Sequence, residues 1–227
     1  MKPALKKLLP ILGSAVLWLQ GCGGNSTSLG QVYFPIDVGD VRNLQRTSAG
    51  GVASFTQTVE SEAPVNGNSV FPFNTVNELG DTVRVDYFGA NTSAGINLCG
   101  WEDFENNASA QYTPCVFFPY LPDGDNISQS TQMVGTGALA NAVSLDYDFT
   151  VESFGDVSVP AGTFSNCATN DVDVVNKDSA GNIIEQGMVT LVLCPEIGMV
   201  SLTTQDFSFG GGTSVLVSGV IDGMAIP

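Results

Sequence analysis

The chain has 227 residues, a formal net charge of −16 at pH 7 and no histidine. Its excess negative charge disfavours nucleic acids and anionic lipid headgroups as partners, because both are themselves negatively charged. The absence of histidine excludes hydrolases built on Ser-His-Asp or Cys-His arrangements, and it removes the commonest transition-metal ligand. We therefore expect a protein that is not an enzyme and that holds no cofactor, with Ca²⁺ as the one alternative considered below.

The N-terminus has the anatomy of a bacterial export signal. Three lysines within the first seven residues precede an apolar run, Leu8 to Leu19, which is too short to span a bilayer. The run ends in Leu19-Gln20-Gly21-Cys22, which resembles the lipobox of a lipoprotein signal peptide. The resemblance implies cleavage after residue 21 and a stable anchor of acyl chains, such as palmitate, on Cys22. Gly23, where an aspartate would favour the inner membrane, implies the outer membrane.

Three segments follow from this signal. Residues 1–21 are the predicted signal peptide, and residues 22–30 are the lipidated cysteine with a polar, glycine-rich tether. Residues 31–227 are predicted to form a single all-β domain, since their length suits one sizeable core. The expected location is the outer membrane of the bacterial cell envelope, with the membrane as a partner through the lipid anchor.

Alternation of apolar and polar residues dominates the predicted domain. It is clearest over 143–152, where odd positions are apolar and even positions carry acids or hydroxyls. A helix would spread both sets around its surface, so the stretch is predicted to be a half-buried strand. Further strands are predicted at 53–59, 83–87, 172–174, 187–193, 199–204 and 214–221.

Helical signals are scarce, and only Gly135–Ala142 suits one or two helical turns. The 26 glycines and 11 prolines supply many turns, among them Gly210-Gly211-Gly212, which we predict to be a hairpin turn. The sequence therefore predicts an all-β fold with little helix: an antiparallel twisted sheet of about ten strands, arranged as a half-barrel or sandwich-like. The acidic strand faces would point to solvent.

The cysteines beyond the lipobox are Cys99, Cys115, Cys167 and Cys194. An even number in an exported chain indicates two disulfides. The midpoint of the first two falls in the turn-like stretch 105–109, and the midpoint of the last two falls in 178–182, so each pair suits two facing strands of a hairpin. We predict the bonds Cys99–Cys115 and Cys167–Cys194. A metal or redox centre is the weaker alternative, because the chain has no Cys-x-x-Cys.

Three short motifs occur in a fixed order along the domain. Tyr33–Asp40 reads YFPIDVGD, Val159–Phe164 reads VPAGTF, and Cys194–Val200 reads CPEIGMV. The set resembles the uncharacterised bacterial envelope lipoproteins of the DUF3108 and TapB-like group. The resemblance implies a twisted antiparallel sheet, such as the half-barrel of lipoprotein carriers, and no established activity. Independently of this resemblance, the backbone preferences of proline and glycine predict a tight turn over Pro160 to Gly162.

Two clusters of acids offer alternative chemistry. Asp123 and Asp125 flank a glycine and could ligate Ca²⁺, although a polar turn explains them as well. Trp101 stands next to acids at positions 102, 103 and 105. Rings stack on sugars and paired carboxylates cleave glycosidic bonds, so Trp101, Glu102, Asp103 and Glu105 suggest a carbohydrate-binding or carbohydrate-active module. A polar turn explains the first cluster equally well, and a loop anchored by the nearby disulfide explains the second.

The stretch 116–122 is unusually apolar, and its aromatic residues are Phe117, Phe118 and Tyr120. They suit either the core or the mouth of a groove that binds an apolar ligand. With Trp101, they are the candidate ligand-binding residues. The leading hypothesis is a non-enzymatic, membrane-anchored envelope lipoprotein that binds an apolar ligand or an envelope partner protein. A carbohydrate module and a calcium-dependent adhesion or assembly module are the alternatives.

Overall fold

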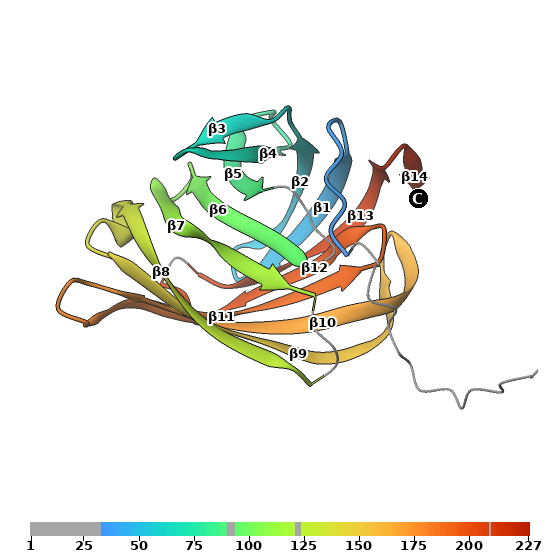
Figure 1. Cartoon of the computed structure of the whole chain (residues 1–227). Coiled ribbons are helices and arrows are strands. Elements are labelled where there is room, and N and C mark those ends of the chain that lie inside the picture. Colours follow the sequence, from blue (N-terminus) through green and yellow to red (C-terminus); the bar gives the residue numbers. More distant parts are fainter. Residues whose placement is uncertain (1–32, 90–93, 121–123, 209) are drawn as a thin grey trace, which may run out of the picture.

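The structure, a computed structural model, describes residues 33–89, 94–120, 124–208 and 210–227. Its strands form one antiparallel sheet in the order β1-β2-β4-β5-β6-β7-β8-β9-β10-β11-β12-β13, and β1 also pairs with β13 (Figure 1). This last pairing closes the sheet into a barrel of twelve strands. The two remaining strands add to it, β3 beside β4 and β14 beside β13. The predicted signal peptide, Cys22 and tether lie outside the described residues.

The elements are β1 (Val41–Ser48), β2 (Gly51–Val59), β3 (Ala63–Val65), β4 (Asn68–Asn77), β5 (Thr82–Gly89), β6 (Gly95–Asp103), β7 (Ala108–Pro119), β8 (Asn126–Thr136), the 3-10 helix η1 (Gly137–Leu139), β9 (Ser144–Val159), β10 (Gly162–Lys177), β11 (Ile183–Cys194), β12 (Gly198–Gln205), β13 (Gly212–Ile221) and β14 (Met224–Ile226). The long strands β9, β10 and β11 form one wall of the barrel (Figure 1). Within the described residues, no helix has the length and apolar character needed to cross a membrane.

The predicted all-β, antiparallel fold with little helix is confirmed, but the predicted architecture is wrong in two respects. The barrel is closed, so it is neither a half-barrel nor sandwich-like, and the sheet has fourteen strands, twelve of them in the barrel, instead of about ten. Closure depends on pairing between residues 41–47 and 213–220, which no local pattern can reveal. The prediction also missed β8, whose sequence is mostly serine, threonine and glutamine and therefore lacks a strong apolar face.

The turns and disulfides agree with the sequence. Val159 ends β9 and Gly162 starts β10 with a φ of 132°, so the Pro-Ala-Gly stretch is a hairpin turn, as predicted. Disulfides join Cys99 to Cys115 and Cys167 to Cys194, the two predicted pairs. Each bond lies where a strand ladder is interrupted: beside the bulge between β6 and β7, and beside the bulge between β9 and β10.

The described chain begins with a segment that closes one end of the barrel. The ring of Phe34 packs against the rings of Phe73 and Phe88, at centroid distances of 5.5 and 4.9 Å. Tyr33 packs against Tyr120 at 5.5 Å and lies near Phe154. Such aromatic contacts add to the burial of large apolar surfaces. The segment therefore forms a plug, defined here as residues 33–40, at the end where β1 starts.

A buried arginine on β1 holds this plug. Arg42 is fully buried, its Nη2 donates to the carbonyl oxygen of Pro35 at 3.3 Å, and its guanidinium lies 5.4 Å from the ring centroid of Phe73. Its carboxylate partner is Asp40, at 3.8 Å, and Asp40 in turn accepts a hydrogen bond from the backbone of Asp222. Burial lowers the pKa of Arg42 to about 10, so Arg42 stays cationic at neutral pH.

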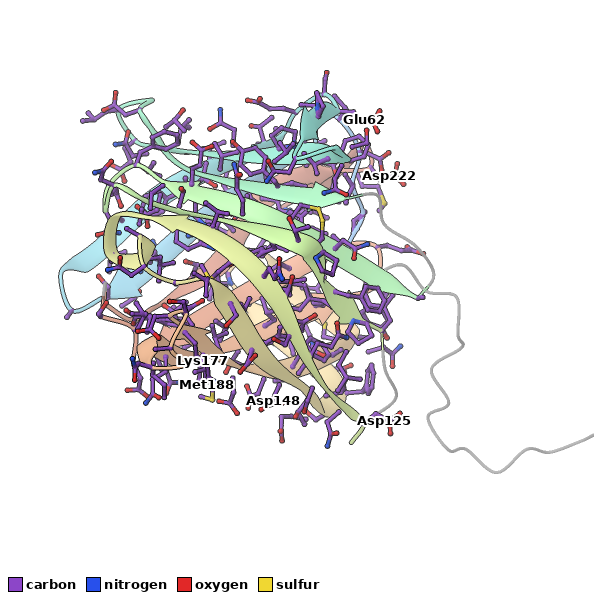
Figure 2. The ribbon with its side chains drawn as sticks, turned by 60° about the vertical axis from the view of Figure 1, so that its left-hand side comes forward. Glu62, Asp125, Asp148, Lys177, Met188 and Asp222 are labelled. Atoms are coloured by element: carbon purple, nitrogen blue, oxygen red, sulfur yellow. A yellow bond between two sulfur atoms is a disulfide. The ribbon has the colours of Figure 1, made fainter. Side chains whose placement is uncertain are left out.

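The outer surface carries an exposed ion pair. Lys177 and Asp146 are joined by a short hydrogen bond, and their side chains are 34% and 40% exposed. Lys177, Met188 and Asp148 lie along one side of the barrel, away from Glu62 and Asp222 (Figure 2). This side is formed by β9, β10 and β11, because Asp173 on β10 is in register with both Met188 and Asp148.

The ion pair predicts a small, pH-dependent effect. Replacing Lys177 by glutamine should lower the free energy of unfolding by less than about 1 kcal/mol at pH 7, because solvent screens exposed pairs. The hydrogen bond from Lys177 lowers the pKa of Asp146 below its unfolded value, so the contribution is present above about pH 4 and is lost as the pH falls further. Urea denaturation at pH 7 and pH 3 checks this, and a difference between variant and wild type that grows at pH 3 would contradict it.

Candidate functional site

The inward faces of the strands enclose a cavity of about 320 Å³. Successive side chains of a strand point to opposite faces, so the apolar set of each strand turns inward. A twelve-stranded barrel is also wider than an eight-stranded one, whose interior side chains can just fill. Much of the wall is apolar and includes Leu44, Phe55, Phe88, Leu98, Leu191 and Leu202. Several of these side chains are only half-buried because they face the cavity instead of a packed core.

The two ends of the cavity differ. At the plug end, the wall includes Phe34, which is 5% exposed and rests on the fully buried Phe73. At the other end, where β6 ends and β7 begins, the wall includes Glu105 and Asn106, both exposed. The cavity therefore runs from a closed, aromatic floor at the plug to a polar mouth. The first described residue, Tyr33, lies at the closed end.

Polar side chains on β5, β6 and β7 form an organised cluster in the wall. Trp101 Nε1 donates to the hydroxyl oxygen of Tyr112 at 2.9 Å, and the guanidinium of Arg84 lies 4.9 Å from the Trp101 ring centroid. Arg84 Nε and Nη2 both donate to Asp86, with the shortest contact at 2.7 Å. Burial raises the pKa of Tyr112 to about 12, so the hydroxyl stays neutral. The cluster fixes the Trp101 ring in the cavity wall.

The candidate ligand-binding residues separate into two pairs. Trp101 and Phe118 line the cavity. Tyr120 instead packs against Tyr33 at the plug, and the ring of Phe117 lies beside Gly95, where an added Cβ would approach it to 2.8 Å. Alternation along β7 explains why Phe117 and Phe118 differ, because adjacent residues of a strand face opposite sides, whereas Tyr120 follows the end of β7 at Pro119.

The three acids near Trp101 lie in different places relative to the cavity. Glu102 is not part of the cavity wall and accepts a hydrogen bond from the Tyr87 hydroxyl at 2.8 Å. Asp103 lines the mouth, where both of its oxygens accept hydrogen bonds from Asn106, at 2.9 Å each. Glu105 is exposed at the mouth. Of these three acids, Asp103 and Glu105 line the same cavity as Trp101, and Glu102 does not.

Half of the candidate calcium site falls outside the described residues, since Asp123 lies there. Asp125 is exposed, and its carbonyl oxygen accepts a hydrogen bond from the backbone of Val151 at 3.0 Å. Among the described residues, no group of three or more acids or cysteines is placed to hold a metal ion.

Sequence reasoning did not identify Arg46 as a site residue, although it lines the cavity near the mouth. On β1 the inward positions are Arg42, Leu44 and Arg46, so arginines stand where an apolar face is expected. Because of these arginines, the alternation of apolar and polar residues did not identify β1 as a strand. The available signal was that only four basic residues remain after residue 21 in a strongly acidic chain. Residues this rare are each candidates for a specific structural or functional role.

Two solved structures have folds similar to that of this chain. A candidate lipoprotein of Parabacteroides distasonis ATCC 8503 is 15% identical, with a TM-score of 0.50 over 83% of this chain and 98% of that one. A candidate exported protein of Bacteroides fragilis NCTC 9343, described as having a YmcC-like fold, is 12% identical, with a TM-score of 0.50 over 82% of this chain and 98% of that one. No protein-family model and no curated protein matches the sequence.

At these identities the likeness concerns the fold alone. The fold of the chain is therefore similar to that of a protein described as having a YmcC-like fold. Membership of the DUF3108 and TapB-like group, inferred from the three sequence motifs, stays a prediction.

Proposed function

We propose that the protein is a non-enzymatic lipoprotein of the bacterial envelope whose barrel binds an apolar ligand. The observation that carries the proposal is the cavity of about 320 Å³, with its largely apolar wall and polar mouth. Ligand pockets typically have about 300–1,000 Å³, apolar walls and a few polar groups that fix orientation. Burial of a ligand chain in such a wall contributes about 0.8 kcal/mol for each methylene.

The envelope location rests on the N-terminal sequence. Residues 1–21 would be removed, Cys22 would carry the lipid anchor, and residues 22–30 would tether the domain of residues 31–227. The two disulfides suit an oxidising compartment. The outer membrane is the proposed destination, because Gly23 follows the lipidated cysteine. With the closed end at Tyr33, the mouth would face away from the membrane.

Trp101 provides a direct reporter of binding. It lines the cavity, and the one other tryptophan, Trp18, lies in the predicted signal peptide. We expect 1-decanol, an uncharged single-chain probe, to change the Trp101 fluorescence saturably. The titration uses the full exported chain reconstituted in phosphatidylcholine vesicles. The probe then distributes between water and lipid in the same way for every variant.

A cavity-filling substitution tests where the probe binds. Val174 lines the cavity, so Val174→Phe should weaken decanol binding at least tenfold by occupying ligand space. Val134→Phe is the matched control, because Val134 is 71% exposed on β8, and its binding curve should equal that of wild type. The proposal fails if wild type shows no saturable change, or if Val174→Phe binds as tightly as wild type while remaining folded.

A further inference from the structure

The four basic residues of the described chain differ in their partners. Arg42 is paired with Asp40, Arg84 with Asp86, and Lys177 with Asp146. Arg46 belongs to no ion pair among the described residues, although the protein has 23 acids for only seven basic residues. A surface so rich in acids makes an arginine without a carboxylate partner unexpected. Arg46 lines the wall of the cavity near the mouth, where its side chain can contact a bound ligand.

The backbone around Arg46 leaves room for its guanidinium. Arg46 is in register with Ser214 on β13, two residues beyond Gly212. A Cβ atom at position 212 would lie 3.0 Å from Arg46 Nε and 2.9 Å from the carbonyl oxygen of Thr47, so a larger residue would push on both. The wall nearest to Arg46 on β13 thus presents a glycine and a hydroxyl, and neither neutralises its charge.

Two of the three acids that line the cavity are already engaged, and the third, Glu105, is exposed at the mouth. Both oxygens of Asp86 accept hydrogen bonds from Arg84, and both oxygens of Asp103 accept them from Asn106. A cationic ligand that approaches Asp86 or Asp103 would have to break these contacts, whereas an anionic ligand at Arg46 would meet a guanidinium that belongs to no ion pair among the described residues. Arginine binds a carboxylate through two parallel, charge-assisted hydrogen bonds, which are stronger than neutral ones.

We propose that the cavity takes a single-chain amphiphile whose anionic head, a carboxylate, binds Arg46 while its chain extends along the apolar wall toward Phe34. This inference rests on the proposed function and names its ligand class. At about 30 Å³ for each water-sized group, 320 Å³ holds about ten such groups, which suits one acyl chain of about ten carbons and not a two-chain lipid. Leu44, on the same face of β1, lies between the head-group position and the floor.

The test compares two probes that differ only in the head group, decanoate and 1-decanol, at pH 7.5. Each is titrated against the full exported chain in phosphatidylcholine vesicles, with Trp101 fluorescence as the readout. Arg46→Gln should weaken decanoate binding about tenfold and leave decanol binding unchanged. Arg46→Lys should restore part of the decanoate affinity, because it keeps the charge but loses the paired donors. Lys177→Gln, which removes a positive charge from the outer surface, should change neither probe.

The outcomes separate the inference from the proposed function. If wild type binds neither probe, the apolar cavity is not a ligand site and both proposals fall. If both probes bind and Arg46→Gln affects neither, or weakens both equally, the proposed function stands and the role of Arg46 is overturned. Tighter binding of decylamine than of decanoate would likewise overturn it, because it would give the ligand head the opposite charge.

Discussion

Replacing Arg42 by methionine is expected to lower the free energy of unfolding by about 3–5 kcal/mol at pH 7, which is the usual cost of leaving one charge of a buried pair without its partner. The charge left behind is that of Asp40, which is 4% exposed. Methionine keeps much of the packing against Phe34 and Phe73, so the loss is chiefly electrostatic. Equilibrium denaturation in guanidinium chloride measures the effect.

The double variant Asp40→Asn/Arg42→Met is the control. It removes both charges, and asparagine can still accept the hydrogen bond from the Asp222 backbone. We expect it to recover most of the lost stability, because replacing a whole buried pair is often nearly neutral. The pair is a poor one in the wild type: Asp40 Oδ2, Arg42 Nε and Arg42 Nη1 are buried without a hydrogen-bond partner among the described residues.

The pH dependence of the single variant gives a second check. Burial already raises the pKa of Asp40, and loss of Arg42 removes a charge that opposes this rise. A carboxyl group whose folded pKa lies above its unfolded value of about 3.9 costs stability only above that value. The deficit of Arg42→Met should therefore shrink as the pH falls from 7 to 4. A deficit that is constant over this range would assign the effect to lost packing.

Strands with one buried and one solvated face were predictable from sequence. In β9 the inward residues Leu145, Tyr147, Phe149 and Val151 alternate with polar residues, and all four are buried as the pattern predicts. Burial of such a face is an additive, local property of the strand. The hairpins followed as well, because Gly162 and Gly181 have positive φ values of 132° and 85° that glycine adopts without strain.

The cavity was not predictable by the same reasoning. A leucine such as Leu191 gives the same local pattern whether it faces a packed core or an empty cavity, since both lie on the inner side of the strand. The difference depends on the number of strands and on closure, which pairs β1 with β13 across most of the chain. The position of Arg46 in the cavity wall was not predictable for a related reason. Sequence alone assigns an arginine in a strand to the solvent face, and only closure of the barrel shows that this face lines a cavity.

Loss of either disulfide is the second large effect. Removing Cys167–Cys194 by substituting both cysteines with alanine should cost about 3.5 kcal/mol, and removing Cys99–Cys115 in the same way should cost about 3 kcal/mol. The order follows from the separations of 27 and 16 residues, because a longer closed loop restricts the unfolded chain more. Guanidinium chloride denaturation of the two paired variants measures both values.

The positions of the two disulfides suggest that they also stabilise the folded state, in addition to restricting the unfolded chain. Cys99 lies where the β6–β7 register breaks between Leu98 and Gly100, and Cys167 follows the break in β10 after Phe164. Cys99–Cys115 therefore bridges the two strands whose ladder is interrupted, whereas Cys167–Cys194 joins β10 to β11 at the end of their ladder, next to the interruption between β9 and β10. The two closed loops do not overlap in sequence, so the losses should add in the fourfold variant. A loss below about 1 kcal/mol for both paired variants would show that strand pairing alone holds these bulges. It would also remove the disulfides as support for an envelope protein that needs an oxidising compartment to fold.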